Sequence, residues 1–417
     1  MERFEQSIQV TKENIAILIN ENQIFEKPSE EQDVSCEILN RKDRAIEVEQ
    51  ELFVDMSNVS EINDEKNDKN ADDGQLEFEM RTLLVEFEHT GTLTLILLVY
   101  VDDVILTKNS IDAITECKLA LHSKFTIKDL GPMKYFLGLE IARSNQAIVI
   151  SQIKYISDVL KDAGMFNCKP ASCPLPQGLH LSPDTGEPFD TLDLYRRLLG
   201  RLLYINLTRP DICYAVQHLS QFMSMPRKPH WEAALHVLRY LKGSLHQGLY
   251  FPVSANMSLN AYCDSDWAAC TYSRKSLSGY CIYLGPCLIS WKTKKQPTIS
   301  KSSTEAEYHA MANTVCELLW ISYILQDLQV TIPLPIPLHC DSKTAMHIAA
   351  NPVFHERTKH IEIDCHLVRD QLQQGFILPH YLPTEKQLAD IFTKVLPASR
   401  HDSLTHKLNF LPLPAST

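Results

Sequence analysis

Two adjacent aspartates, Asp102 and Asp103, interrupt the apolar stretch LLVYVDDVILT that runs from Leu97 to Thr107. Burying two unpaired carboxylates in a core costs on the order of several kcal/mol each. Such a pair is tolerated at a tight turn where a cation reaches both side chains. The pattern of strand, two aspartates and second strand therefore predicts a hairpin that holds divalent metal ions.

Four further carboxylates stand where apolar runs would otherwise continue, and they lie far apart in the sequence: Asp264 in YCDSDW, Glu307 in STEAEY, Asp341 in HCDSK and Asp390 in LADIF. Four carboxylates that converge in a core need cations to neutralise them. Magnesium is the natural ion because it is hard and prefers oxygen ligands, so we predict two Mg²⁺ ions here, with Mn²⁺ as a substitute. A carboxylate of this kind taken alone is more often a surface or capping residue than a catalytic one, and the alternative role of Asp341 is to cap the helix that follows it.

Two more acids, Asp266 and Glu305, lie close in sequence to these carboxylates. Asp266 has period-two spacing to Asp264, so both face the same side of a strand, and we expect Asp266 to be solvated or to support the metal ligands without binding the ion itself. Glu305 lies two residues before Glu307 on a helix and is expected to be exposed.

The elements that must position the four carboxylates can be read from residue 259 onward. The sequence predicts three strands in 259–296, a long helix in 300–328, a short strand and a helix in 336–352, a helix in 357–375, a strand in 376–383 and a last helix in 384–397. Thr384 and Gln387 stand at capping-box spacing for the last helix. The predicted order is β-β-β-α-β-α-α-β-α.

The charge of the chain is concentrated at its beginning. The net charge is −12, but residues 1–90 hold 24 acidic and 9 basic residues, and the remainder holds 28 acidic and 31 basic residues. The segment EINDEKNDKNADDG (Glu61–Gly74) marks the extreme, and we expect an acidic, mostly disordered head over residues 1–80. The mildly basic body is compatible with nucleic acid.

Other features of the sequence indicate an intracellular protein without a membrane span. Twelve cysteines form no Cys-x-x-Cys pair, and no signal peptide is evident. The longest apolar run, LTLILLVYV, has 9 residues, whereas a bilayer needs about 20. We expect a cytoplasmic or nuclear location and no secretion.

Within its flanks, the aspartate hairpin resembles the reverse transcriptase of copia-type LTR retrotransposons. The resemblance continues through KFTIKDLGPMKYFLGLEIARS, YISDVLKDAGM, YRRLLGRLLYINLTRPDICYAVQHLSQFM and ALHVLRYLKGS, and it covers roughly Leu84 to Leu396. The part from residue 257 onward is similar to the ribonuclease H domain of the same elements. There Asp264, Glu307, Asp341 and Asp390 match the Asp-Glu-Asp-Asp set of the family, which implies metal binding and catalysis.

The polymerase site is incomplete in this sequence. The resemblance implies a third carboxylate upstream, in an apolar-apolar-Asp motif followed by Ala-Phe-Leu, together with a fingers region. The nearest candidate is Asp55 in ELFVDMSNVSE, which lacks the Ala-Phe-Leu. We therefore expect Asp102 and Asp103 to be a vestigial metal pair and the polymerase activity to be lost.

The resulting fold class is α+β. We predict an acidic head, part of a reverse transcriptase palm, a helical thumb or connection, a ribonuclease H-like mixed five-stranded sheet with helices, and a tail, in the ranges 1–80, 81–175, 176–256, 257–400 and 401–417.

The predicted function is magnesium-dependent cleavage of the RNA strand of RNA–DNA hybrids. Basic residues near the site are expected to contact the phosphates of the hybrid: Lys292, Lys294, Lys295, Lys301, Arg274, Lys275, Arg357 and Lys359. The alternative is an idle retroelement remnant that binds only nucleic acid or another Pol chain, and a third interpretation is a sequence that yields no stable product.

Overall fold

The computed structural model describes residues 83–90, 93–100, 103–108, 111–125, 127–253, 256–351 and 362–412. The predictions for the acidic head, Asp55, Asp102, Arg357 and Lys359 fall outside these ranges. From Leu84 onward the described residues belong to one compact unit. Within the described ranges, no helix combines the length and the apolar character that crossing a bilayer requires.

The aspartate hairpin forms part of a three-stranded sheet in the order β1-β2-β3, with bounds β1 Leu83–Thr90, β2 Leu93–Tyr100 and β3 Asp103–Lys108. Strands β2 and β3 pair antiparallel, with Tyr100 opposite Asp103. Ile96 and Leu98 share one buried face of β2, as the two-residue repeat of a strand requires. The helix α3, Ile111–Lys124, follows β3, and the pairing of β2 with β3 confirms the predicted hairpin.

A helical layer follows, built on amphipathic segments that contribute Leu, Ile and Val to one apolar core. Its helices are α4 Ile153–Asp162, α5 Leu192–Ile205, α6 Cys213–Leu219 and α7 Lys228–Gly243, with 3-10 turns η1 Pro210–Ile212 and η2 Ser220–Phe222. The interior also holds a charged pair, in which Arg209 Nη2 lies 2.7 Å from Asp211 Oδ2 and both side chains are fully buried.

An antiparallel sheet in the order β13-β7-β6-β5-β4 gathers strands from distant parts of the sequence. Its bounds are β4 Tyr135–Phe136, β5 Leu139–Arg143, β6 Ala147–Ser151, β7 Gln247–Pro252 and β13 Phe410–Pro412. The sheet joins strands from the predicted palm, connection and tail, because Phe410 pairs with Leu249 and Ile150 pairs with Leu249 on its other side. Helix α11, Ala398–Lys407, spans the predicted boundary at residue 400, so that boundary is wrong: the tail begins within a helix and includes a strand.

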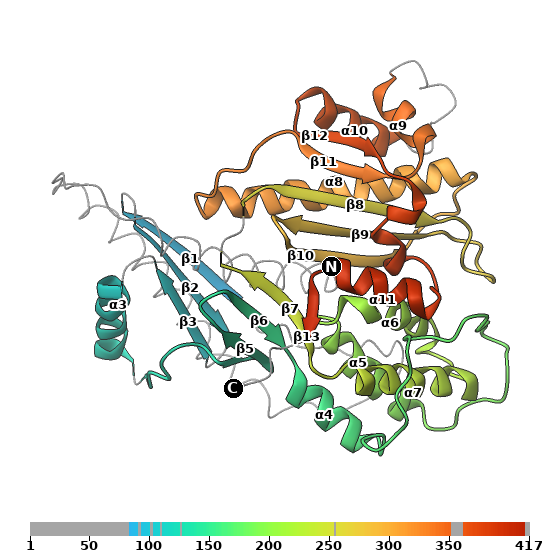
Figure 1. Ribbon diagram of the computed structural model, residues 1–417, viewed down its shortest axis with the longest axis horizontal. Coiled ribbons are helices and arrows are strands. Elements are labelled where there is room, and N and C mark those ends of the chain that lie inside the picture. The colour runs from blue at the N-terminus through green and yellow to red at the C-terminus, as the bar shows by residue number, and fades with distance from the viewer. Residues whose placement is uncertain are drawn as a thin grey trace, which may run out of the picture. The chain divides into compact units, whose positions relative to one another are not determined.

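The sheet that contains Asp264 has the order β10-β9-β8-β11-β12 (Figure 1). Its bounds are β8 Leu259–Asp266, β9 Leu277–Leu284, β10 Cys287–Lys295, β11 Ile336–Cys340 and β12 Ile377–Tyr381. The first three strands pair antiparallel, and β8, β11 and β12 pair parallel. This is the ribonuclease H-like arrangement, which confirms the predicted mixed five-stranded sheet.

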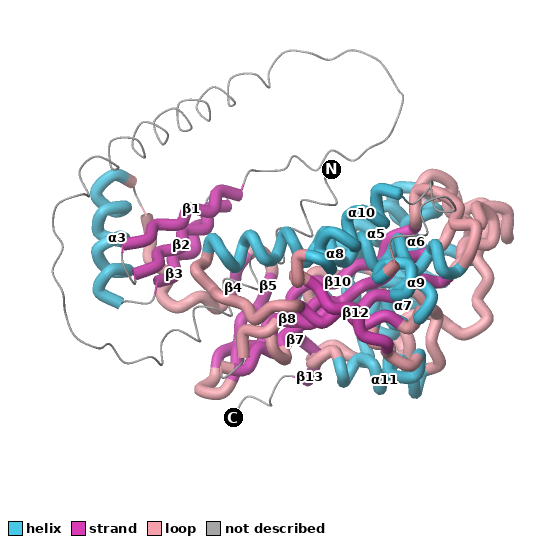
Figure 2. The backbone as a smooth tube through the Cα atoms, turned by 90° about the horizontal axis from the view of Figure 1, so that it is seen from above, coloured by secondary structure: helices cyan, strands magenta, loops and turns pink. Residues whose placement is uncertain are grey.

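Helix α8, Ser303–Asp327, packs on β8 and β9, and α10, Glu362–Gln373, lies beside α8 in both views (Figures 1 and 2). Helix α9, Lys343–Ala350, follows β11. All eight residues of β9 are buried, because β8 and β10 flank this strand while α8 covers one face and a short turn near residue 390 covers the other.

The predicted last helix over 384–397 is wrong. The chain there forms two 3-10 turns, η5 Thr384–Lys386 and η6 Ala389–Phe392. The buried side chain of Gln387 interrupts the helix, because its Nε2 donates to Cys263 O at 2.9 Å and its Oε1 accepts from Ala389 N at 3.1 Å, while its backbone is extended. The predicted capping box is not formed.

Candidate metal-dependent nuclease site

Asp264 lies in the middle strand of the sheet, near the end of β8, and its side chain is 1% exposed. Directly opposite on β9 stands Gly279. A Cβ atom on this glycine would lie 2.7 Å from Phe392 Cβ and 2.7 Å from Thr393 Cγ2. The glycine therefore lets η6 approach the sheet closely, and this approach brings Asp390 to Asp264.

Glu307 reaches the same place from the first turns of α8. The helix begins at a Ser302 cap, whose hydroxyl accepts from Glu305 N at 3.2 Å. Glu307 Oε1 accepts a hydrogen bond from Ser265 N at 3.2 Å, so the carboxyl is fixed beside the residue that follows Asp264. Glu307 is 8% exposed.

Asp341 follows β11, whose parallel pairing with β8 brings its end beside Asp264. The Thr384 hydroxyl donates to Asp341 Oδ2 at 2.9 Å. The capping alternative for this residue is excluded, because the N-cap of α9 is Ser342, which accepts from Ala345 N. Ligand atoms of Glu307, Asp341 and Cys340 lie within 4.8 Å of one another.

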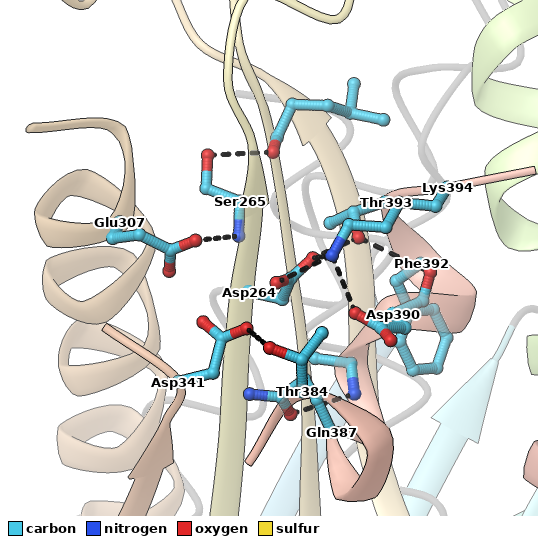
Figure 3. A network of polar contacts seen from close by, with 12 residues as sticks. Asp264, Ser265, Glu307, Asp341, Thr384, Gln387, Asp390, Phe392, Thr393 and Lys394 are labelled. Atoms are coloured by element: carbon cyan, nitrogen blue, oxygen red, sulfur yellow. Dashed lines mark hydrogen bonds and ion pairs between the residues drawn. The ribbon is translucent and has the colours of Figure 1, made fainter. Parts of the chain in front are cut away.

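Asp390, in η6, completes the set, and Figure 3 shows how it faces Asp264 across the side chain of Lys394. Lys394 Nζ donates to Asp390 Oδ1 at 2.7 Å and to Asp264 Oδ1 at 3.2 Å. Arg400 Nη2 lies 3.4 Å from Asp390 Oδ2. The Thr393 hydroxyl donates to Asp264 Oδ2. The structure thus brings all four predicted carboxylates together.

The electrostatics of the site shift the pKa values of Glu307, Asp264 and Lys394. Burial, together with Asp264, Cys340 and Asp341, raises the pKa of Glu307 to about 10. Burial also raises the pKa of Asp264 to about 6, although Lys394 and Thr393 oppose the rise. The pKa of Lys394 is raised as well, since Asp264 and Asp390 outweigh the opposing effect of its burial.

This donor set fits a hard divalent cation. The described group whose ligand atoms lie within 4.8 Å of one another is Glu307, Cys340 and Asp341, and Glu307 is held beside Asp264 by its bond to Ser265 N. Carboxylate oxygens are the ligands that Mg²⁺ prefers in proteins. A buried carboxyl whose pKa is raised to about 10 keeps its proton at neutral pH unless a cation replaces it. The Cys340 thiol is a soft neighbour that Mg²⁺ does not need.

The two neighbouring acids behave differently from each other. Asp266 is partly buried at the end of β8, and burial raises its pKa. The expectation that Glu305 is exposed is wrong: this residue is 6% exposed, because its Oε2 accepts from Lys301 N at 2.8 Å and folds the carboxyl back over the start of α8.

The predicted phosphate-contacting residues do not share one face of the sheet. In the strand register, Lys292 stands opposite Tyr280 and Cys263, whereas Asp264 stands opposite Gly279 and Thr293. Since directly opposite residues share a face, Lys292 and Lys294 lie on the α8 face and Lys295 lies on the face of Asp264.

Other basic residues of this set differ in exposure. Lys294, Lys301 and Arg274 are exposed, and Lys275 is partly buried. Lys295 Nζ donates to Gln221 Oε1 at 2.8 Å and lies 5.2 Å from the centre of the Tyr272 ring. Burial lowers the pKa of Lys292.

At the polymerase hairpin, Asp103 begins β3 and is exposed. Among the described residues, the groups of acidic, histidine and cysteine side chains that could hold a metal do not include it. The predicted metal role of Asp102 and Asp103 stays a prediction, because Asp102 lies outside the described ranges.

Sequence reasoning missed Thr393, Lys394 and Cys340, all of which contact or adjoin the four carboxylates. A signal for Lys394 was present, because an acid and a lysine at i and i+4 often pair. No spacing rule connects Cys340 with Glu307 or Thr393 with Asp264, since strand pairing and the close approach of η6 create those contacts.

The fold and site define a ribonuclease H-like domain that follows part of a polymerase. A family model for reverse transcriptase (RNA-dependent DNA polymerase) matches residues 74–177. The chain is 39% identical to the Retrovirus-related Pol polyprotein from transposon RE2 of Arabidopsis thaliana over 78% of its own length and 22% of that protein. It is 46% identical to an uncharacterized mitochondrial protein of the same plant, over 54% of its own length and 94% of that protein.

The chain belongs to the copia-type retrotransposon Pol family. It spans about a fifth of the length of the RE2 polyprotein. Among solved structures, the N-terminal ribonuclease H domain of a Mycobacterium tuberculosis protein, fused to maltose binding protein, aligns at 10% identity over 36% of this chain and 98% of that one. The TM-score of this alignment is only 0.24, and the ribonuclease H-like assignment rests on the strand order and pairing described above.

Proposed function

We propose that the chain cleaves the RNA strand of RNA–DNA hybrids at the site built by Asp264, Glu307, Asp341 and Asp390. The observation that supports this function is the grouping of the four carboxylates: Asp264 and Asp390 share the Lys394 ammonium, and ligand atoms of Glu307 and Asp341 lie within 4.8 Å of each other. Two of them, Asp264 and Glu307, have raised pKa values because they are buried close to other acids. Structural carboxylates are rarely grouped in this way, because each one destabilises its neighbours.

Magnesium is the cofactor that this donor set would hold, with Asp264, Glu307 and Asp341 as its ligands. When bound, the ion would polarise an attacking water and stabilise the leaving oxygen of the ribose. Glu307 is fixed by Ser265 N, so it offers one oxygen toward the cation or a ribose hydroxyl while the other is held by the backbone. Asp264 is oriented by Thr393 and Lys394, which prevents its carboxylate from turning away.

The substrate class that we propose is an RNA–DNA hybrid. A hybrid of A-like form is recognised through its shape and its 2′-hydroxyl groups, so we expect no strong sequence preference. Among the predicted phosphate contacts, Lys295 lies on the Asp264 face of the sheet, and Lys301 is exposed just before α8.

The alternative function is binding of nucleic acid or of another Pol chain without cleavage. The observation that favours it is the engagement of Asp264 by Thr393 and Lys394, which occupies both carboxylate oxygens with protein donors. In that case the carboxylates would be neutralised by protein donors and would serve only the fold, and adding divalent ions would not produce cleavage of the hybrid.

The deciding experiment compares the full chain with amide variants on a labelled RNA–DNA hybrid in the presence of Mg²⁺. Asp264→Asn, Glu307→Gln and Asp341→Asn keep the shape of each side chain and remove its charge, so each should abolish cleavage. Asp390→Asn should leave partial activity, because Lys394 and Arg400 already neutralise that residue. Calcium should support hybrid binding without cleavage, since its looser coordination does not enforce the required geometry.

The matched control is Asp370→Asn, which changes an exposed acid of α10 and should cleave like the wild type. Hybrid binding by each variant, measured in parallel, should stay close to the wild-type value. A folded wild type that gives no magnesium-dependent product, or a product that persists in Asp264→Asn, would exclude the nuclease function and favour the alternative.

A further inference from the structure

Lys394 occupies a place in the site that a cation would otherwise take. Its ammonium lies between two carboxylates that are 1% and 5% exposed, those of Asp264 and Asp390, at 3.2 and 2.7 Å. The lysine side chain itself is 31% exposed, and its ammonium lies between the two carboxylates (Figure 3). An ammonium has three donors, and Asp264 and Asp390 both accept from it.

The charges of the four carboxylates are divided unequally. Asp264 and Asp390 together have two cationic partners, Lys394 and Arg400. On the other side, Glu307 accepts from Ser265 N and Asp341 accepts from the Thr384 hydroxyl, and both donors are neutral. Within the described part of the chain, no lysine, arginine or histidine forms an ion pair with Glu307 or Asp341.

Among the described residues, Glu307 and Asp341 have neutral hydrogen-bond donors and no cationic partner, so one cation would suffice to balance this half of the site. A divalent ion beside Asp264, Glu307 and Asp341 would balance the side that lacks cations. A second divalent ion between Asp264 and Asp390 would have to displace the lysine ammonium, which already supplies positive charge to both carboxylates.

We propose that Lys394 serves as the fixed cation for the Asp264–Asp390 half of the site, so that the chain binds one divalent ion, at Asp264, Glu307 and Asp341, where four carboxylates alone would predict two. Lys394 is then a positioning residue: it holds Asp264 in place and supplies a donor on the side of the site away from Glu307. The inference rests on the proposed metal-dependent site, but it does not require that the chain cleaves a hybrid.

The test is a count of bound Mn²⁺ on the full chain without nucleic acid, by electron paramagnetic resonance of the free ion and by titration calorimetry. A variant that carries Asp264→Asn, Glu307→Gln, Asp341→Asn and Asp390→Asn together gives the number of ions that bind elsewhere on the chain, and this number is subtracted. The wild type should then bind one ion. Lys394→Met, which keeps the length of the side chain and removes its charge, should bind two.

Two further variants make the count specific. Asp390→Asn in the Lys394→Met background removes a ligand of the second ion and should return the count to one. Lys386→Met changes an exposed lysine of η5 and should leave the count at one. Circular dichroism of each variant confirms that it is folded.

Each outcome decides the inference. A wild-type count of two overturns it, even if Lys394→Met fails to fold, and so does a Lys394→Met count of one. One bound ion without cleavage of the hybrid would uphold the inference and overturn the nuclease function. Cleavage with two bound ions would overturn the inference and uphold the nuclease function. A wild type that binds no ion at the site overturns both.

Discussion

Replacing Glu307 by glutamine should stabilise the metal-free protein at neutral and alkaline pH, although the same change should abolish cleavage. The reason is the proton that Glu307 keeps in the folded state. Its pKa rises from the model-compound value of 4.5 to about 10, because the side chain is buried next to Asp264, Cys340 and Asp341. Between these two values the folded chain binds more protons than the unfolded chain, so stability falls as the pH rises through that window.

The magnitude follows from the same window. One pKa unit corresponds to about 1.4 kcal/mol, and pH 7.5 lies about three units above the unfolded value, so the penalty at that pH is at most about 4 kcal/mol. Glutamine carries no proton to exchange and escapes the penalty. For a domain of this size each kcal/mol shifts the melting temperature by about 2–4 °C, which gives a rise on the order of 10 °C.

The assay is thermal unfolding in EDTA, followed by circular dichroism from pH 5 to pH 8. The gain of Glu307→Gln over the wild type should be small at pH 5 and should grow steadily with pH. Adding Mg²⁺ should stabilise the wild type more than the variant, because the ion replaces the proton on Glu307. Glu362→Gln, an exposed acid of α10, is the matched control and should show no such trend. A variant that is less stable than the wild type at pH 7.5, or a difference that is constant with pH, would refute this reasoning.

Further predictions concern packing, charge and the polymerase hairpin. Gly279→Ala should destabilise the chain by about 1–3 kcal/mol and lower cleavage, because its Cβ would meet Phe392 and Thr393 at 2.7 Å and push η6 from β9; denaturant unfolding and the hybrid assay check this. Asp211→Asn should cost about 3–5 kcal/mol in denaturant unfolding, because it leaves the fully buried Arg209 without its charged partner. This 417-residue chain should give no primer extension, and extension that Asp102→Asn removes would contradict the vestigial assignment. Deleting residues 1–80 should tighten hybrid binding at low salt and change it little at high salt, because the acidic head competes with phosphates; titrations at both salt levels measure it.

The sequence alone predicted the class of fold and the four carboxylates of the candidate site. Alternating apolar residues with turn signals predicted the strands of 259–296, and the helical repeat predicted α8, because these patterns are local and follow the geometry of each element. Four isolated acids in apolar surroundings predicted a cation site, because burying charge is costly wherever it happens. The family resemblance then set their order, and the structure brings all four together.

Only the tertiary structure decided how the charges of the site are balanced. The last predicted helix became two short turns because Gln387 bonds to Cys263, which lies 124 residues away, and no local pattern contains that contact. The burial of Glu305 depends on how its carboxyl folds over the start of α8. The place of Lys394 between Asp264 and Asp390 depends on the close approach of η6 to β9, which the absence of a side chain at Gly279 permits. Sequence patterns report which groups must be neutralised, whereas the identity of the neutralising cation depends on distances between distant segments that only the packed chain fixes.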